Sequence, residues 1–232
     1  MQPRTTVKPT LYRHPHGITA VDCEYLYSGH AAAHLIVDEG RAAFVDVGTN
    51  DSVPYLLGAL DELGIARAAV DYLLLTHVHL DHAGGAGALM QELPNARALL
   101  HPRGAPHMID PTRLVAGAKA VYGEESFRRM YGELLPIPSS RVRVVADGDR
   151  VALGSRSLEL IHTPGHAQHH YWSSMRRTPA SSAATPSASP IVPSTPARAP
   201  SSPRPRYRRS STPSSTLHPS IACSPTTPSP ST

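Results

Sequence analysis

The stretch from Thr76 to Gly85, THVHLDHAGG, places three histidines and one aspartate within six residues. Imidazole nitrogens and carboxylate oxygens are ligands for zinc, and catalytic zinc sites usually combine three protein ligands with a water molecule. In an extended segment the side chains at i, i+2 and i+4 leave the same side, so His77, His79 and Asp81 can converge. His82 follows where the two glycines let the chain turn into a helix. The spacing predicts a metal site.

A second histidine group, HTPGHAQHH at 162–170, follows another predicted strand. Proline and glycine in the middle of this stretch favour a tight turn, which presents His166 from the end of the strand. Its other histidines are interpreted either as hydrogen-bond partners of the ligands or as exposed residues: His162, His169 and His170. Isolated histidines are more often surface or satisfied core residues, and four are interpreted in that way: His30, His34, His101 and His107.

Alternating strand and helix patterns surround both groups. The continuous apolar run before His77 predicts a strand buried on both faces. Repeated strand–helix order predicts an α/β layered core over residues 1–172. A polar, helix-rich insertion, 111–135, is expected to shape a substrate pocket. The predicted strands cover 18–28, 31–40, 41–50, 69–77, 96–102 and parts of 141–166, and the predicted helices cover 53–64 and 84–93.

Composition divides the chain after residue 172. Residues 173–232 contain 17 Ser, 13 Pro, 8 Thr and 7 Arg, and no acidic residue follows Glu159. Such a segment has too few large apolar residues to form a core, so the sequence predicts a disordered tail. Residues 1–172 carry a net charge of −3, so the tail accounts for the overall +4. Nucleic-acid binding is therefore not expected.

No apolar run reaches the roughly 20 residues that a membrane span needs, and the N-terminus lacks the apolar stretch of a secretory signal. The two cysteines, Cys23 and Cys223, are far apart and match no metal-binding spacing. The expected location is the cytoplasm, with no membrane partner.

Three motifs together resemble the metallo-β-lactamase-fold hydrolase superfamily, over about residues 15–172. They are FVDVG at 44–48, THVHLDH at 76–82 and TPGHAQHH at 163–170. The HTPGH form is similar to the glyoxalase II-like branch, which cleaves thioesters. A histidine at 79, where the iron-binding branch has glutamate, indicates the zinc hydrolases.

The resemblance implies a small-molecule thioester or other ester as substrate and one or two zinc ions as cofactor. Asp81 would also be catalytic, because it would orient the attacking hydroxide, and Asp46 would hold a ligand in place. The implied ligands are His77, His79 and His166 for the first zinc, and Asp81 and His82 for the second.

The family pattern also includes a bridging Asp and a last His after His166. No acidic residue follows Glu159, and His218 lies in the tail, so the second metal site is expected to be incomplete. The expected fold is therefore only the N-terminal part of an αββα sandwich, residues 1–172, followed by a tail, 173–232. We hypothesise that the chain is truncated or frameshifted after about residue 172, and predict that it is poorly soluble and nearly inactive.

The alternative function is a non-catalytic protein that uses its basic, proline-rich tail as a docking arm. The segment PRPRYRR at 203–209 favours this hypothesis. The ligand cluster argues against it, because a docking protein needs no metal ligands. Superfamily members also cleave lactones, β-lactams and phosphodiesters, and the fold alone does not choose among these substrates.

Overall fold

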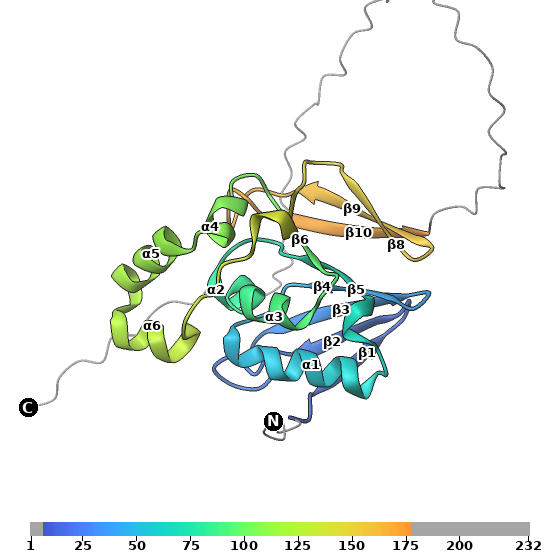
Figure 1. Cartoon of the computed structure of the whole chain (residues 1–232), viewed down its shortest axis with the longest axis horizontal. Helices are drawn as coiled ribbons and strands as arrows, with labels where there is room; N and C mark the ends of the chain where they lie inside the picture. The colour runs from blue at the N-terminus through green and yellow to red at the C-terminus, as the bar shows by residue number, and fades with distance from the viewer. Residues whose placement is uncertain (1–6, 178–232) are drawn as a thin grey trace, which may run out of the picture. The chain divides into compact units, whose positions relative to one another are not determined.

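The computed structural model describes residues 7–177, which form a seven-stranded and a three-stranded sheet (Figure 1). The strands are β1 (Leu11–His14), β2 (Ile18–Asp22), β3 (Ala32–Asp38), β4 (Arg41–Val45), β5 (Val70–Leu74), β6 (Arg97–Leu100), β7 (Val142–Val144), β8 (Arg150–Leu153), β9 (Arg156–His162) and β10 (Tyr171–Arg177). The helices are α1 (Val53–Glu62), α2 (Leu80–Ala83), α3 (Ala86–Glu92), α4 (Ala105–Ile109), α5 (Thr112–Tyr122) and α6 (Glu124–Tyr131), and the short 3-10 turns are η1 (Asn50–Ser52), η2 (Arg67–Ala69) and η3 (Ser139–Arg141).

The large sheet keeps its strands in chain order, β1 to β7. Strands β1 to β4 pair in antiparallel fashion, and β4 to β7 pair in parallel. The β3–β4 hairpin turns at Glu39 and Gly40, which both have positive φ, as a two-residue type I′ turn requires. The small sheet is antiparallel, in the order β10-β9-β8. The parallel strands end at one edge of the large sheet, where the ligand motif follows β5.

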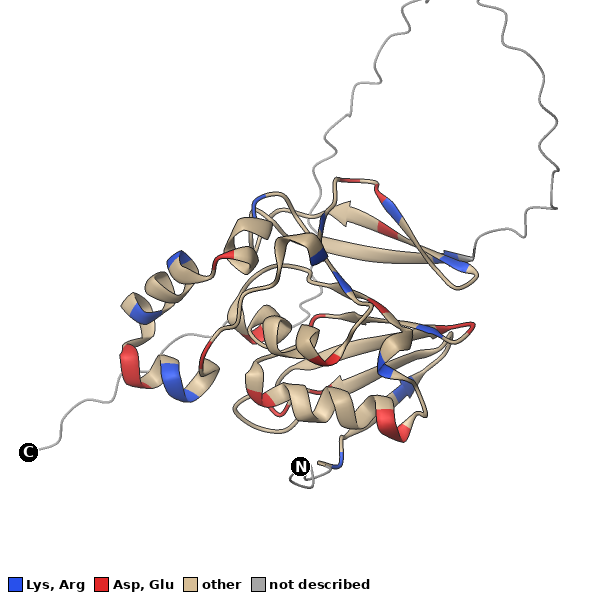
Figure 2. Cartoon of the chain, viewed as in Figure 1, with Lys and Arg blue, Asp and Glu red and all other residues tan. Residues whose placement is uncertain are grey.

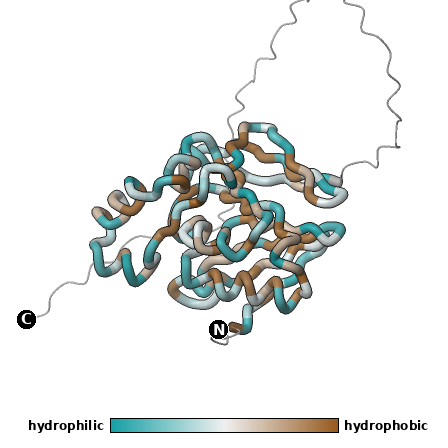
Figure 3. The backbone as a smooth tube through the Cα atoms, in the orientation of Figure 1, coloured by the Kyte–Doolittle hydropathy of each residue, from teal (hydrophilic) through white to brown (hydrophobic). Residues whose placement is uncertain are grey.

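Neighbouring residues of the central strands face two different cores. Ala42 and Phe44 of β4 pack in the first core, whereas Ala43 between them packs in the second. Leu73 and Leu74 of β5 divide in the same way. Hydrophobic segments accordingly follow the central strands in Figure 3. The predicted burial of β5 on both faces is confirmed, and it explains the unbroken apolar run.

The first core contains the buried side chains of α1, α3 and α4, and the second core joins the large sheet to the small one. The described layers are therefore helices, large sheet and small sheet. This mixed α/β arrangement corresponds to a partial αββα sandwich, as predicted. Each helix of residues 7–177 is too short or too polar to cross a membrane. Acidic and basic residues are interspersed over these elements (Figure 2), in keeping with the small net charge.

Most predicted elements are present. The predicted helix over 53–64 is α1, which ends at Glu62 and is followed by Gly64 with φ +67°, the left-handed conformation common just after a helix. Strand β1 was not predicted, because it is four residues long and almost wholly exposed and therefore lacks an apolar pattern. The short helices α2 and α4 were not predicted either, because four or five residues are too few to show a helical period.

The expected boundary at Ser173 differs from the structure. Strand β10 continues to Arg177, and Ser173 pairs with Leu160 of β9. Met175 packs against the second core, which supplies the apolar contact that the surrounding Ser and Arg residues do not reveal in the sequence. The rest of the predicted tail, 178–232, lies outside the described residues, together with His218, Cys223 and the basic segment at 203–209.

Candidate metal centre

His77 and His79 lie just beyond β5, and Asp46 lies just beyond the parallel neighbour β4. His166 comes from the turn between β9 and β10 in the small sheet. The start of β10 is bonded to the end of the β5 segment, because the Tyr171 amide donates to the carbonyl oxygen of Thr76 at 2.8 Å. This contact brings the two histidine groups of the sequence to the same place.

The three histidines converge. His77, His79 and His166 each offer one ligand atom, and these atoms all lie within 4.8 Å of one another. His79 Nδ1 lies 3.0 Å from His166 Nε2. Two nitrogens bound to one tetrahedral zinc at about 2.0–2.1 Å would be separated by about 3.3 Å. The arrangement therefore fits a shared cation with only a small adjustment.

His77 is the most informative of the three, because its side chain is only 2% exposed. Its Nδ1 lies 3.0 Å from the hydroxyl of Thr76, and that hydroxyl donates to the Asp46 carboxylate. The hydroxyl must then accept the Nδ1 proton, which leaves Nε2 with its lone pair. This Nε2 is buried and has no hydrogen-bond partner among the described residues. A buried acceptor without a donor fits a metal ligand.

The electrostatics of His77 favour the neutral, ligating form. Burial lowers the pKa of His77 to about 2, and the neighbouring imidazoles of His82, His79 and His166 contribute to this decrease. Burial also lowers the pKa of His79, with a contribution from His166. A metal ligand must be unprotonated, so both shifts prepare these rings for a cation.

Asp46 organises two of the histidines. One carboxylate oxygen accepts hydrogen bonds from the amide and hydroxyl of Thr76, at 2.8 and 3.0 Å. The other lies 2.8 Å from His82 Nδ1, and His82 Nε2, on the opposite side of the ring, lies 3.5 Å from Asp81 Oδ2. Burial works to lower the pKa of His82, but the bond to Asp46 and the charges of both nearby carboxylates together raise it. Asp46 thus orients His82 directly and His77 through Thr76.

Asp81 and His82 lie in α2, not in an extended segment. The spacing i, i+2, i+4 therefore explains the convergence of His77 and His79 only, and the extension of that reasoning to Asp81 is wrong. Asp81 Oδ2 lies 3.5 Å from His82 Nε2. Within residues 7–177, the three histidines are the one group of three or more ligand-type side chains that could hold a cation. Asp81 and His82 form a pair beside that group.

The other histidines of the 162–170 stretch, left open in the sequence, have definite partners. His169 Nε2 accepts a hydrogen bond from the amide of Val78, the residue between His77 and His79, at 3.2 Å. His170 Nδ1 lies 2.8 Å from the hydroxyl of Thr163. His162 Nε2 lies 3.1 Å from the carbonyl oxygen of Gln168. These contacts stabilise the turn that carries His166. Sequence reasoning overlooked Thr76, although its place directly before His77 was visible.

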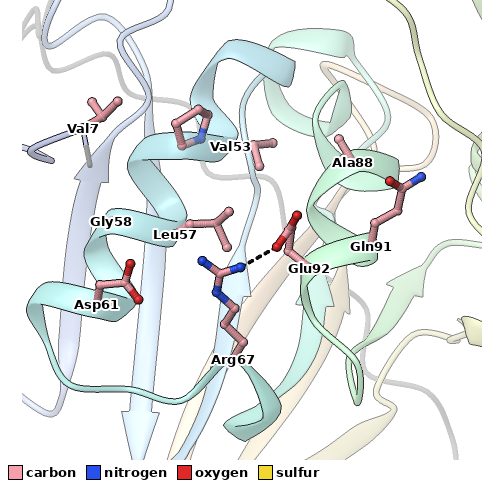
Figure 4. Close-up of a pocket in the computed structure, with 10 residues that line it drawn as sticks. Val7, Val53, Leu57, Gly58, Asp61, Arg67, Ala88, Gln91 and Glu92 are labelled. Atoms are coloured by element: carbon pink, nitrogen blue, oxygen red, sulfur yellow. Dashed lines mark hydrogen bonds and ion pairs between the residues drawn. The ribbon is translucent and has the colours of Figure 1, made fainter. Parts of the chain in front are cut away.

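A cavity of about 450 Å³ lies elsewhere, between α1 and α3. Figure 4 shows Arg67 paired with Glu92 across it, with Leu57 on the α1 wall. None of its lining residues belongs to the histidine group, so the cavity is separate from the candidate centre.

Residues 26–178 match the family model of the metallo-beta-lactamase superfamily. This match spans about two thirds of the sequence, and the fold and histidine geometry agree with it. The chain belongs to the metallo-beta-lactamase superfamily.

Individual relatives agree with this assignment. The chain is 31% identical over 137 residues to a hydroxyacylglutathione hydrolase of Aeromonas hydrophila, a match that covers 59% of this chain and 39% of that enzyme. It is 31% identical over 162 residues to an uncharacterized protein of Mycobacterium tuberculosis, with 66% and 60% coverage. The structure resembles that of MEM-A1, a subclass B3 metallo-beta-lactamase from a soil metagenome library, with a TM-score of 0.55, 26% identity and 75% and 60% coverage.

The predicted family resemblance is confirmed, and the Aeromonas enzyme represents the expected glyoxalase II-like relatives. The chain spans only about two fifths of the length of the Aeromonas enzyme and three fifths of the length of the mycobacterial protein. Their activities therefore do not transfer directly to this chain.

Proposed function

We propose that this protein is a zinc-dependent hydrolase that acts on a small-molecule thioester or a related activated ester. The observation that carries the proposal is the buried, unpartnered Nε2 of His77, a residue that offers one ligand atom within 4.8 Å of those of His79 and His166. A neutral imidazole in that position needs a cation to satisfy its lone pair. Imidazole ligands suit zinc, and three histidines with one open position are typical of catalytic zinc sites.

His77 would hold the ion through Nε2, His79 through Nδ1 and His166 through Nε2. Bound zinc lowers the pKa of a water molecule to near 7 and polarises a carbonyl group. Asp81 is the proposed catalytic residue. Its carboxylate is 40% exposed and lies beside His82. It can therefore accept a proton from the attacking water and orient that water toward the substrate.

We propose that a second ion binds only weakly, beside Asp81 and His82. Those two side chains supply only two ligand atoms, and within residues 7–177 they belong to no group of three or more ligand-type side chains. The nearby Asp46 carboxylate is already bonded to His82 Nδ1 and to Thr76. With one ion, the carboxylate of Asp81 carries the proton transfer alone. The activity of this chain is therefore expected to be low.

The similarity to a hydroxyacylglutathione hydrolase supports a thioester substrate, because that enzyme's name describes an acyl thioester of glutathione. The similarity to a metallo-beta-lactamase of known structure supports metal-assisted attack on an activated carbonyl more generally. A panel of a thioester, a lactone and a phosphodiester would distinguish these substrate classes.

The test is zinc content and affinity in the full chain, measured by mass spectrometry of metals and by competition with a chelator. We expect about one zinc per chain. His77→Ala should weaken zinc binding more than about 100-fold, because loss of residues that merely orient ligands already costs up to that much. His14→Ala, an exposed histidine on β1, is the control and should leave zinc affinity unchanged.

Zinc-dependent hydrolysis of the thioester, lost in His77→Ala and kept in His14→Ala, would complete the support. A purified chain without zinc affinity, or equal affinity in the two variants, would contradict the proposal and favour the non-catalytic docking protein.

A further inference from the structure

The loop between β2 and β3 is held in one conformation by a buried carboxylate. Asp22, at 1% exposure, accepts hydrogen bonds from the amide of Glu24, the hydroxyl of Ser28 and the amide of Gly29, at 2.9, 2.9 and 2.6 Å. A buried charge with three donors is a rigid anchor. The side chains at the tip of this loop are therefore presented in a defined position.

The tip presents apolar groups to solvent. Leu26 is 62% exposed and has φ +61°, a left-handed conformation that is unfavourable for a leucine, and Tyr27 is 64% exposed. Strained backbone of this kind persists only where surrounding structure enforces it, and it is concentrated at functional sites. A fixed loop with an exposed leucine and tyrosine points to a binding surface.

The helical insertion continues this surface. The hydroxyls of Tyr25 in the loop and Tyr131 in α6 lie 3.0 Å apart, and their rings are stacked at 6.1 Å. The ring centroids of Tyr122 in α5 and Tyr131 are 6.0 Å apart. The ring centroid of His30 lies 4.6 Å from that of Tyr27 and 5.7 Å from that of Tyr25. These five rings, which we term the aromatic shelf, run from the loop tip to the insertion.

The aromatic shelf borders the candidate centre. Leu80, which lies between His79 and Asp81, packs in one cluster with Tyr131 and Phe127 of the insertion. Tyr25 is in contact with the same cluster. Burial raises the pKa of both tyrosines, so their bonded hydroxyls stay neutral. The shelf is thus joined, through Tyr131 and Leu80, to the segment that carries His79.

We propose that the aromatic shelf binds an apolar group of the substrate, namely the alkyl chain or aryl ring of an apolar acyl thioester. This inference rests on the proposed hydrolase function and specifies its substrate class. The exposed shelf rings, Tyr27 and Tyr122, offer apolar faces without a fixed charge, so they favour a carbon chain over a charged acyl group.

The test uses binding of non-hydrolysable analogues to the full, zinc-loaded chain by calorimetry. The probes are 2-oxoalkyl thioethers of N-acetylcysteamine, with alkyl chains of two to ten carbons, in which a methylene separates the carbonyl from sulfur. Affinity should rise about two- to four-fold for each methylene that contacts the shelf. Tyr27→Ala and Tyr122→Ala should each weaken the ten-carbon ligand about ten-fold and leave the two-carbon ligand nearly unchanged.

Tyr12→Ala is the matched control, because Tyr12 is also exposed, at 53%, but lies on β1. Affinity independent of chain length, or equal losses in Tyr12→Ala and Tyr27→Ala, would overturn the inference. If binding follows chain length but no thioester is hydrolysed, the shelf stands and the hydrolase proposal fails. If thioesters of all lengths are hydrolysed alike and bind alike, the hydrolase stands and the shelf fails.

Discussion

At the scale of single residues, the centre depends on groups that never touch the proposed ion. Thr76 connects the carboxylate of Asp46 to His77 Nδ1, and the same carboxylate holds His82 Nδ1. Each of these bonds selects the tautomer that exposes the opposite nitrogen. His169 adds a backbone contact through the amide of Val78. The candidate ligand atoms are therefore already oriented by the protein, which would lower the entropy cost of binding an ion.

Asp46→Ala tests this arrangement. The variant removes the acceptor for His82 and for the Thr76 hydroxyl, which in turn bonds His77. The rings of His82 and His77 can then rotate and change tautomer. We expect zinc affinity to fall about 10- to 100-fold, measured by chelator competition. Asp71→Ala removes a carboxylate that pairs with Arg41, away from the histidines, and serves as the control. Similar zinc affinity in the two variants would show that Asp46 does not orient the ligands.

At the scale of elements, a buried ion pair joins the two sheets next to the β3–β4 turn of the large sheet and the β8–β9 turn of the small sheet. Asp38 ends β3, and Arg156 begins β9. Arg156 Nε lies 2.8 Å from Asp38 Oδ1, and the amide and hydroxyl of Ser155 donate to Asp38 Oδ2 at 2.7 Å. Both charged residues are buried, since Arg156 is 8% exposed and Asp38 is 9% exposed. This ion pair fixes the small sheet, which leads into the turn with His166, against the large sheet, which leads into the segment with His77 and His79.

Asp38→Ala should destabilise the fold by about 3–5 kcal/mol, because it leaves the Arg156 guanidinium buried without its carboxylate. The measurement is the free energy of unfolding in urea. Arg150→Ala is the control, since Arg150 is 63% exposed in its pair with Glu159 and should cost no more than about 1 kcal/mol. A loss of equal size in both variants would contradict a special role for the buried pair.

At the scale of the whole described region, the predicted poor solubility depends on how apolar the outward face of the small sheet is. Arg150, Glu159 and Arg176 form ion pairs across this face, at 3.2 and 3.7 Å. Trp172 is the large apolar residue exposed there, at 62%. A partial sandwich would be poorly soluble if it left an apolar sheet face uncovered, and the described face carries these ion pairs instead. Poor solubility itself stays a prediction.

Global stability should depend on pH through Cys23, which is 2% exposed. Burial raises the pKa of its thiol from 9.0 to about 11. The folded state then keeps a proton that the unfolded state has lost, so this stabilisation is complete below pH 9 and is lost as the pH rises to about 11. The loss should be roughly 2–3 kcal/mol by the two-unit shift.

The measurement is the free energy of unfolding of the wild type and of Cys23→Ala at several values between about pH 8 and 11. The free energy of unfolding of the variant should lack the decrease that the Cys23 thiol causes. The decrease caused by other titrating groups should be the same in both proteins. Parallel curves over the whole range would contradict the raised pKa.

Much of the fold followed from local patterns. The unbroken apolar run of β5 predicted a strand buried on both faces. The apolar residues of α1, Val53, Leu56, Leu57, Leu60 and Leu63, predicted its helix, because their spacing repeats over enough residues to be visible. Strand β10 was missed, since Ser173, Ser174 and two arginines hide a strand whose stability comes from pairing with β9. Local composition does not reveal a partner strand.

Local patterns in the sequence identified the family and the candidate ligands, because His77 and His79 form a short-range pattern and Pro164-Gly165 favours the turn before His166. Only the tertiary structure decided that His166 Nε2 lies 3.0 Å from His79 Nδ1, 87 residues away, and that Tyr25 meets Tyr131 across 106 residues. Such contacts depend on the register of the strands and the packing of the two sheets. Those are set by the sum of many distant interactions, which no local spacing encodes.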